Sequence, residues 1–148
     1  MDRLINNEGI VICSVVSAMN MDVNEISKLY LFVLLTSDRA IRKRLTGYKT
    51  YEEMVARESS FYQALNRKFL EFQPVFMNAM TMLEMGGKIE NKEGHRYELT
   101  REGYMMALDL QQSSKDMEEE LLQVAIHLHD LLGEKGTKEL YKDLKIVL

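Results

Sequence analysis

Cysteine, proline and tryptophan are almost missing from this chain. Its 148 residues include one cysteine, Cys13, one proline, Pro74, and no tryptophan. A single cysteine cannot form an internal disulfide and is typical of proteins kept in a reducing compartment. A chain of this length buries enough surface to fold without a disulfide or a metal ion. These absences exclude a small disulfide-bonded scaffold and predict a cytoplasmic globular protein.

Long hydrophobic runs are also absent. The runs at 10–19 and 29–35 are each too short to span a bilayer, and polar residues separate them. The first residues include Asp2 and Arg3 in place of a basic run, and the apolar block that follows has no small-residue cleavage site. We therefore expect no signal peptide and no association with membranes.

Positive charge is in deficit, because 19 lysines and arginines face 23 aspartates and glutamates. This balance argues against general affinity for nucleic acids, which requires a surplus of positive charge. Catalytic motifs are missing too: the chain has no G-x-S-x-G, phosphate loop, C-x-x-C or H-E-x-x-H sequence. His127 and His129 are two residues apart on an expected helix, so their side chains diverge and cannot share a metal ion. We expect neither an enzyme nor a bound cofactor or metal.

The most informative stretch that is present spans residues 65–103. Pro74 suits the first turn of a helix, and Gly86 with Gly87 suits the end of the same helix. Residues 88–91 and 95–99 then alternate polar and apolar side chains around 92–94, which is typical of a β-hairpin. With a preceding helix through Leu65 and a following helix capped by Thr100, this order predicts a mostly α fold, a winged helix-turn-helix with a two-stranded wing.

The helix expected at 74–85 contains no lysine or arginine, and Glu84 is its only charged residue. A helix that reads bases in the major groove needs side chains that bond to base edges, and only Gln73 and Asn78 qualify here. Methionine, which is frequent in this helix, suits adaptable interfaces. Core packing is the alternative for any one of these side chains. We predict a protein interface formed by Phe76, Met77 and Met80.

Helices are expected along most of the remaining chain. Apolar periodicity and capping residues predict helices at about 8–19, 24–36, 39–45, 51–57, 59–70 and 101–112. The first is apolar nearly all round, so it should be central and buried. The expected caps are Asn24, Asp38 and Thr50, the last with Glu53 in a capping box.

One basic cluster stands out in this acidic chain: Arg39, Arg42, Lys43 and Arg44. The plainer interpretation is a solvated short helix, since charge runs are usually on the surface. The alternative is a docking site for the phosphate backbone of DNA, without sequence specificity, or for an acidic partner surface. The sequence leaves both interpretations open.

The last part of the chain, 113–148, is predicted to be a helical extension of a winged-helix domain at 1–112. Met117, Leu121, Val124, Leu128 and Leu131 recur at alternating spacings of four and three, which is an a/d seam of about two heptads. Such a seam packs on the chain's own core or forms a homodimer. The chain finishes with apolar residues, so Ile146 and Leu148 are further candidates for the interface.

The chain resembles a bacterial family, the middle component of ABC-three-component systems, a group that includes Lamassu-type anti-phage defence. The resemblance covers about 7–148. It rests on Asn7-Glu8, the apolar helix through 29–35, Asn66-Arg67-Lys68-Phe69, then Pro74, Asn78 and Leu83, Tyr97-Glu-Leu-Thr100 with Gly103, and 144–148. It implies a non-catalytic adaptor that bridges an SMC- or Rad50-like ABC ATPase and an effector subunit such as a nuclease. The family has no catalytic residues to transfer, and Asn66 and Arg67 are expected to be structural.

Two other functions compete with this adaptor. A dimeric winged-helix transcriptional regulator of the MarR or PadR type would use the C-terminal seam for dimerisation and the basic cluster for phosphate. A purely structural helical dimer would have no other partner and a melting temperature that depends on protein concentration.

Overall fold

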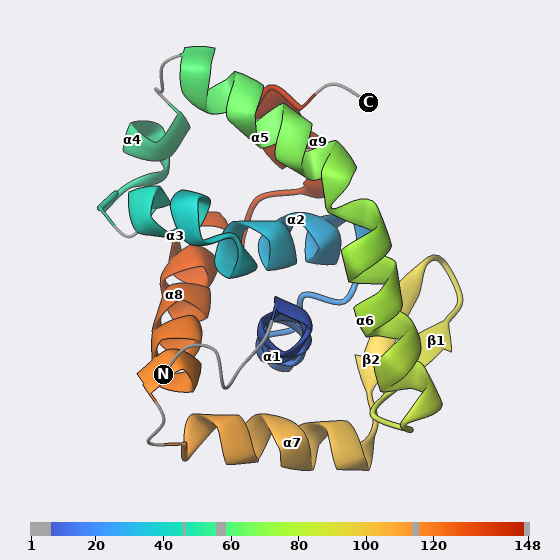
Figure 1. Ribbon diagram of the computed structural model, residues 1–148. Helices are drawn as coiled ribbons and strands as arrows, with labels where there is room; N and C mark the ends of the chain where they lie inside the picture. Colours follow the sequence, from blue (N-terminus) through green and yellow to red (C-terminus); the bar gives the residue numbers. More distant parts are fainter. Residues whose placement is uncertain (1–6, 46, 56–58, 114–115, 147–148) are drawn as a thin grey trace.

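The computed structural model describes residues 7–45, 47–55, 59–113 and 116–146, which form a mostly α fold with one two-stranded hairpin (Figure 1). In chain order the elements are α1 (Asn7–Asn20), α2 (Ile26–Ser37), α3 (Arg39–Leu45), α4 (Tyr51–Val55), α5 (Ser59–Glu71), α6 (Gln73–Met85), β1 (Ile89–Lys92), β2 (Arg96–Leu99), α7 (Arg101–Gln111), α8 (Asp116–Leu132) and α9 (Thr137–Asp143). Among these described residues, no helix is long and apolar enough to cross a membrane.

Helix α1 is the centre of the fold. Figure 1 shows it nearly end-on, surrounded by α2, α6, α7 and α8, and it contacts all four. Val15 and Val16 have no exposed surface, and Val11 and Met19 are buried with them. The prediction of a central buried helix is confirmed. A helix that is apolar on nearly every side needs neighbours on every side, and the other helices provide them.

Helix α2 is the second buried layer, and its residues 31–36 are all buried. Its N-cap is Glu25, whose carboxylate Oε2 accepts a hydrogen bond from the backbone N–H of Lys28 at 2.9 Å. The expected cap at Asn24 was therefore wrong by one residue. Asn24 instead uses its backbone carbonyl, which accepts from the N–H of Tyr97 in β2.

The short helices α3 and α4 begin as their sequences predict. Asp38 Oδ1 accepts from the N–H of Ile41 at 3.0 Å, and Thr50 Oγ1 accepts from the N–H of Glu53 at 3.1 Å. In a capping box the Glu53 carboxylate would accept the N–H of Thr50 itself. It accepts the N–H of Lys49 instead, so only half of the expected capping box is formed. Local hydrogen bonds of this kind involve neighbours in sequence, which is why sequence predicts them well.

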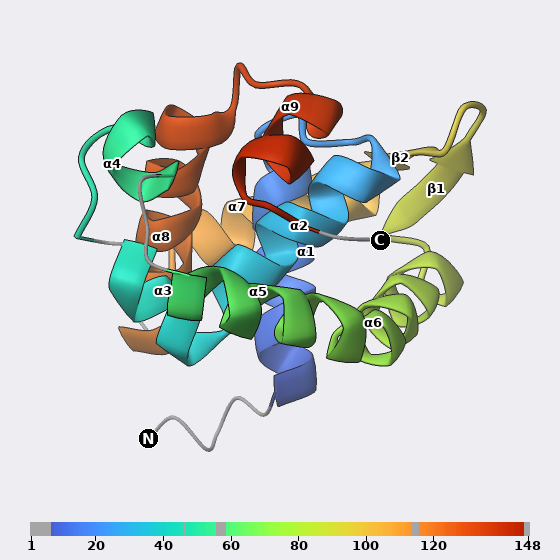
Figure 2. The same cartoon turned by 90° about the horizontal axis from the view of Figure 1, so that it is seen from above.

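The junction between α5 and α6 is a bend and has no separate turn. Phe72, the single residue between them, has helical angles (φ −77°, ψ −19°), and hydrogen bonds continue across it from Phe72 N–H to Lys68 and from Phe76 N–H to Phe72. Figures 1 and 2 show the two helices following one another along one side of the molecule. Pro74 lacks an N–H and bends the pair. The expected helix-turn-helix is not confirmed at this place, because Phe72 alone separates the two helices and such a motif usually has a turn of three to four residues.

The predicted hairpin is present. Strands β1 and β2 pair antiparallel with Ile89 opposite Leu99, and Gly94 takes a left-handed φ of 75° in the turn. The backbone before α2 extends the hairpin, since Glu25 forms a β-bridge with Arg96. Thr100 then caps α7, accepting from the N–H of Gly103 at 3.1 Å, as expected.

The C-terminal helices complete the same core. Leu121, Val124 and Leu128 are buried, and α8 contacts α1, α2 and α7. Leu131 is half-buried against the same core, and the side chain of Met117 lies outside what the structure describes. The described part of the a/d seam therefore packs within the chain. Helix α9 contributes Leu140, and Leu144 follows it into the core. The described part of 113–148 thus shares one hydrophobic core with the residues before it.

Candidate docking face on α6 and α7

Helix α6 has a buried side and an exposed side. Phe76 and Ala79 have no exposed surface, and Met80 and Leu83 are 2% and 4% exposed. These four recur at spacings of three, one and three, which is the core-facing stripe of a helix. Phe76 packs edge-on against Tyr30 of α2, with ring centroids 5.0 Å apart. The predicted interface at Phe76 and Met80 is therefore wrong, because both side chains are part of the core.

The exposed side of α6 is nevertheless apolar. Val75, Met77 and Met82 are 42%, 42% and 45% exposed, and Met85 is 83% exposed. Of the three residues predicted for the interface, Met77 alone is on this side. Val75, Met82 and Met85 were not singled out from sequence. The signal was available, because helical periodicity places residues 75, 77, 82 and 85 off the stripe once the core positions 76, 79, 80 and 83 are fixed.

Helix α7 adds a second group of exposed apolar side chains. Its inward residues are Gly103, Ala107 and Leu110, while Tyr104, Met105 and Leu108 are each more than half exposed. The end of α6 meets the start of α7 at the base of the hairpin, where Thr100 Oγ1 donates to the carbonyl of Gly87. We call the exposed side chains of both helices the α6–α7 face: Val75, Met77, Met82, Met85, Tyr104, Met105 and Leu108.

The approach of these two helices depends on one glycine. A Cβ atom placed on Gly103 would be 2.1 Å from the carbonyl oxygen of Lys88. No side chain fits at that distance, so α7 can start beside β1 only with glycine at this position. The same carbonyl accepts the N–H of Thr100. Gly103 therefore fixes where the α7 part of the face lies relative to α6.

Positive charge is scarce around this face. Helix α6 carries only Glu84 as a charged residue. On the hairpin, Lys92 Nζ is 3.1 Å from Glu90, and hydrogen bonding to this carboxylate raises the pKa of Lys92. Asn78, one of the two predicted base-reading side chains, donates to the Glu8 carboxylate at 3.2 Å. Helix α6 therefore offers apolar contact and no cation to bind phosphate, and the exposed cations nearby, Arg96 and Arg101, are on β2 and α7.

The basic cluster of α3 is divided by burial. Arg42 is 4% exposed, and its Nη1 donates to the carbonyls of Thr36 and Ser37 at 3.0 and 3.3 Å. Its Nη2 is 3.7 Å from the carboxylate of Glu120 on α8. The predicted phosphate contact at Arg42 is therefore wrong, because this guanidinium caps the end of α2. Arg39, Lys43 and Arg44 remain exposed on α3.

The C-terminal candidates do not form part of the face. Ile146 is half-buried, packs against the core, and donates its N–H to the carbonyl of Tyr141 at 2.9 Å. Leu148 lies outside the described residues. Asn66 Nδ2 donates to the carbonyl of Lys145 at 2.8 Å, which fits the structural role expected for it. Arg67 is exposed on α5.

No catalytic or metal centre is found in the part of the chain that the structure describes. It contains no cluster of three His, Cys, Asp or Glu residues able to hold a metal ion. The phenols with raised pKa values, Tyr30, Tyr51 and Tyr141, owe them chiefly to burial in packed helices. Comparisons with family models, with curated proteins and with solved structures found no match to this chain.

Proposed function

We propose that this protein is a non-catalytic adaptor of a bacterial three-component ABC ATPase defence complex. In this proposal it bridges an SMC- or Rad50-like ATPase and an effector subunit. The observation that carries the proposal is the α6–α7 face, where seven large apolar side chains are 42% to 83% exposed on two adjoining helices. Exposed apolar side chains are ordinary when scattered, but seven concentrated on two helices that adjoin at one hairpin form a candidate protein interface.

The composition of the face favours a protein partner over DNA. Methionine and tyrosine are enriched in protein interfaces, and four methionines with Tyr104 make up most of the set. A DNA-binding surface would need lysine and arginine to displace counterions from phosphates. Helix α6 has neither. Two observations weigh against the regulator hypothesis: Leu121, Val124 and Leu128 of the C-terminal seam are buried within the chain, and Arg42 is buried as well.

A winged helix remains part of the proposal in a changed form. The hairpin follows α6 directly, and an isolated β-bridge between Glu25 and Arg96 pairs the segment between α1 and α2 with β2. These features are consistent with α2 and α6 as the two central helices of such a fold, with α3, α4 and α5 inserted between them. The outward side of α6 would then be the side that other winged helices turn toward DNA.

The test is co-purification from the native host with the SMC- or Rad50-like ABC ATPase that this proposal requires. Met82→Asp and Met85→Asp place charge on exposed positions of the face, and Gln123→Asp places the same charge on an exposed position of α8. We expect the two methionine variants to fold and to weaken ATPase binding by about tenfold or more, since central apolar contacts dominate interface energies. Gln123→Asp should bind like the wild type.

Normal ATPase binding by the double variant Met82→Asp, Met85→Asp would refute the face as the interface. Circular dichroism of each variant shows that loss of binding is not loss of folding. Wild-type protein that binds no ATPase but shifts its own promoter DNA at low salt would instead establish the regulator.

A further inference from the structure

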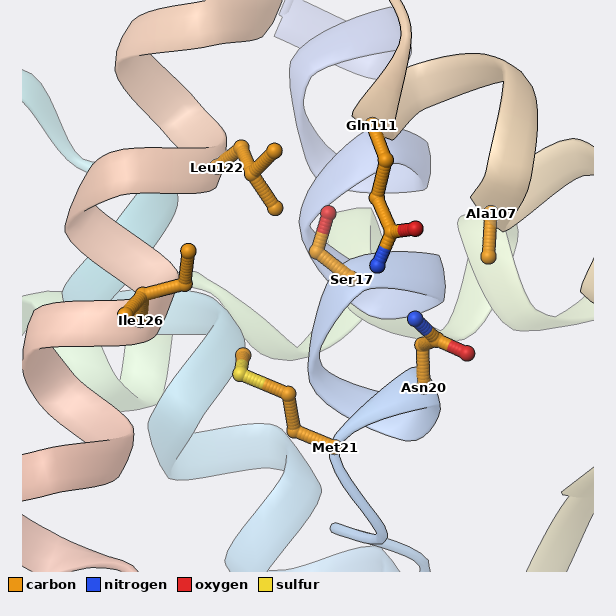
Figure 3. A pocket seen from close by; sticks show the side chains of 7 residues that line it. All are labelled: Ser17, Asn20, Met21, Ala107, Gln111, Leu122 and Ile126. Carbon is orange, nitrogen blue, oxygen red and sulfur yellow. The ribbon is translucent and has the colours of Figure 1, made fainter.

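A small cleft lies between α1, α7 and α8, and its lining includes Ala107, one of the core-facing residues of α7. Its volume is about 270 Å³, and it is lined by Ser17, Asn20, Met21, Ala107, Gln111, Leu122 and Ile126. Figure 3 shows Leu122 and Ile126 pointing in from α8 on one wall, with Ala107 and Gln111 of α7 on the other. Residues of the last turn of α1 form the floor.

The polar groups of this cleft have no partners of their own. No hydrogen bond joins the side chains of Ser17, Asn20 or Gln111 to any other residue that the structure describes. Ser17 is the most telling, because it is only 7% exposed. A buried hydroxyl in a helix usually bonds to the carbonyl four residues earlier, as Ser14 does in the same helix at 2.9 Å. The Ser17 hydroxyl instead points into the cleft (Figure 3).

The two carboxamides complete a polar edge. Figure 3 shows the amide groups of Asn20 and Gln111 directed toward one another across the cleft, from α1 and α7. A carboxamide both donates and accepts hydrogen bonds, and a hydroxyl does the same. Three such groups together can satisfy both the donor and the acceptor of a ligand amide. Ser17 is 7% exposed, whereas Asn20 is half-buried and Gln111 is exposed, so the gain from a ligand hydrogen bond is greatest at Ser17, where solvent has the least access.

The other lining residues determine the polarity, charge and size of a ligand that fits the cleft. Met21, Leu122 and Ile126 form an apolar wall opposite the carboxamides, and none of the seven lining side chains is charged. A charged ligand would lose its hydration without finding an opposite charge. The volume limits the ligand to a small molecule, since clefts for drug-sized ligands begin at about 300 Å³.

We propose that this cleft binds an uncharged small molecule that carries an amide and a branched aliphatic group. The amide lies on Ser17, Asn20 and Gln111, and the aliphatic group lies against Met21, Leu122 and Ile126. The site is separate from the α6–α7 face and does not depend on the proposed adaptor function.

N-acetyl-L-leucine amide is a suitable probe, titrated into the ¹⁵N-labelled full chain and followed by NMR. We expect the side-chain amide signals of Asn20 and Gln111 to shift and saturate in about the millimolar range, as for ligands of this size. N-acetyl-L-leucine has nearly the same shape but a carboxylate, and it should bind at least about tenfold more weakly. Absence of any shift with the amide would overturn the proposal.

Variants place the ligand in the cleft. Gln111→Ala should weaken binding about fivefold or more, whereas Gln112→Ala, at the next exposed position outside the cleft, should leave binding unchanged. Ala107→Leu should abolish binding by filling the space, with a cooperative melt showing that it folds. Equal affinity of all three variants would overturn the assignment.

A capped tripeptide, acetyl-Gly-Leu-Gly-amide, tests whether the cleft binds a small molecule or a segment of a peptide. Its chain continues on both sides of the leucine, so a site with a volume of only about 270 Å³ should bind it more weakly than the single capped residue. Tighter binding of the tripeptide would overturn the small-molecule assignment and give the cleft to a peptide segment.

Discussion

Replacing Arg42 by alanine should destabilise the fold, although sequence placed this residue in a basic surface cluster. The last carbonyl groups of a helix have no partner within the helix. At the end of α2, the carbonyls of Thr36 and Ser37 are satisfied by Arg42 Nη1, at 3.0 and 3.3 Å. Arg42 is 4% exposed, so these carbonyls are shielded from water and depend on the guanidinium for their hydrogen bonds. Arg42→Ala therefore removes a cap from a buried helix end.

The size of the effect follows from these contacts. A hydrogen bond from a charged donor contributes about 1.5–3 kcal/mol, and the longer bond belongs at the low end. The ion pair to Glu120 adds little, because that carboxylate is 3.7 Å away and 54% exposed. Arg42 Nε has no hydrogen-bond partner among the described residues, which offsets part of the gain. We expect a loss of about 2–4 kcal/mol, or about 5–15 °C in melting temperature.

Urea denaturation followed by circular dichroism measures this loss directly. Lys43→Ala is the matched control, since it removes a neighbouring positive charge from an exposed position and should change stability by less than about 0.5 kcal/mol. Glu120→Ala should also remain within about 1 kcal/mol of the wild type. An Arg42→Ala protein as stable as the Lys43→Ala protein would refute the capping role and return Arg42 to the surface cluster.

Three further predictions test other parts of the structure. Gly103→Ala should cost about 3 kcal/mol or more or prevent folding, because its Cβ would be 2.1 Å from the Lys88 carbonyl, whereas Gly136→Ala, with no atom within 4 Å, should be nearly neutral; equal urea midpoints would contradict this. Phe76→Ala should cost about 3–5 kcal/mol and Met85→Ala less than about 0.5 kcal/mol, since the side chains are 0% and 83% exposed. Burial raises the pKa of Tyr30 from 10.0 to about 12 and moves Tyr51 and Tyr141 in the same direction, so the folded state retains these protons more tightly. Stability should therefore be complete below the unfolded pKa and fall as pH rises from about 10 toward 12, while the lowered pKa of Lys28 acts weakly in the opposite direction. A urea midpoint that rises over that range would contradict the burial of the phenols.

Sequence predicted the elements well where the determinants are local. Asp38, Thr50 and Thr100 cap the helices expected of them, because each cap binds an N–H three residues away. The hairpin was predicted from alternation and a glycine turn. The junction at Phe72 was missed for a related reason: Pro74 indicates a break in hydrogen bonding, but it does not distinguish a bend from a turn.

Sequence could not predict what a helix face packs against when the contacting residues are distant along the chain. The period of the α8 seam was read correctly, but a seam has the same pattern whether it meets a second copy or α1 of the same chain. Arg42 illustrates the same limit, since only the fold brings the end of α2 against α3 and Glu120 of α8. Of the four residues in the predicted basic cluster, Arg39, Lys43 and Arg44 are therefore on the surface, and Arg42 is a buried cap of α2.

The functional argument changes with this reassignment of faces. When Phe76 and Met80 are placed in the core, the Met-rich composition of α6 is no longer explained by packing alone, because Met77, Met82 and Met85 remain outside. Helix α6 could satisfy its core stripe with polar residues on the outward side, as α8 does with Glu119, Gln123 and Asp130. Among the described residues, α8 exposes one large apolar side chain, Ile126, whereas α6, which packs on the same α1, exposes four. This concentration on α6, next to the exposed apolar residues of α7, supports a protein as the occupant of the α6–α7 face.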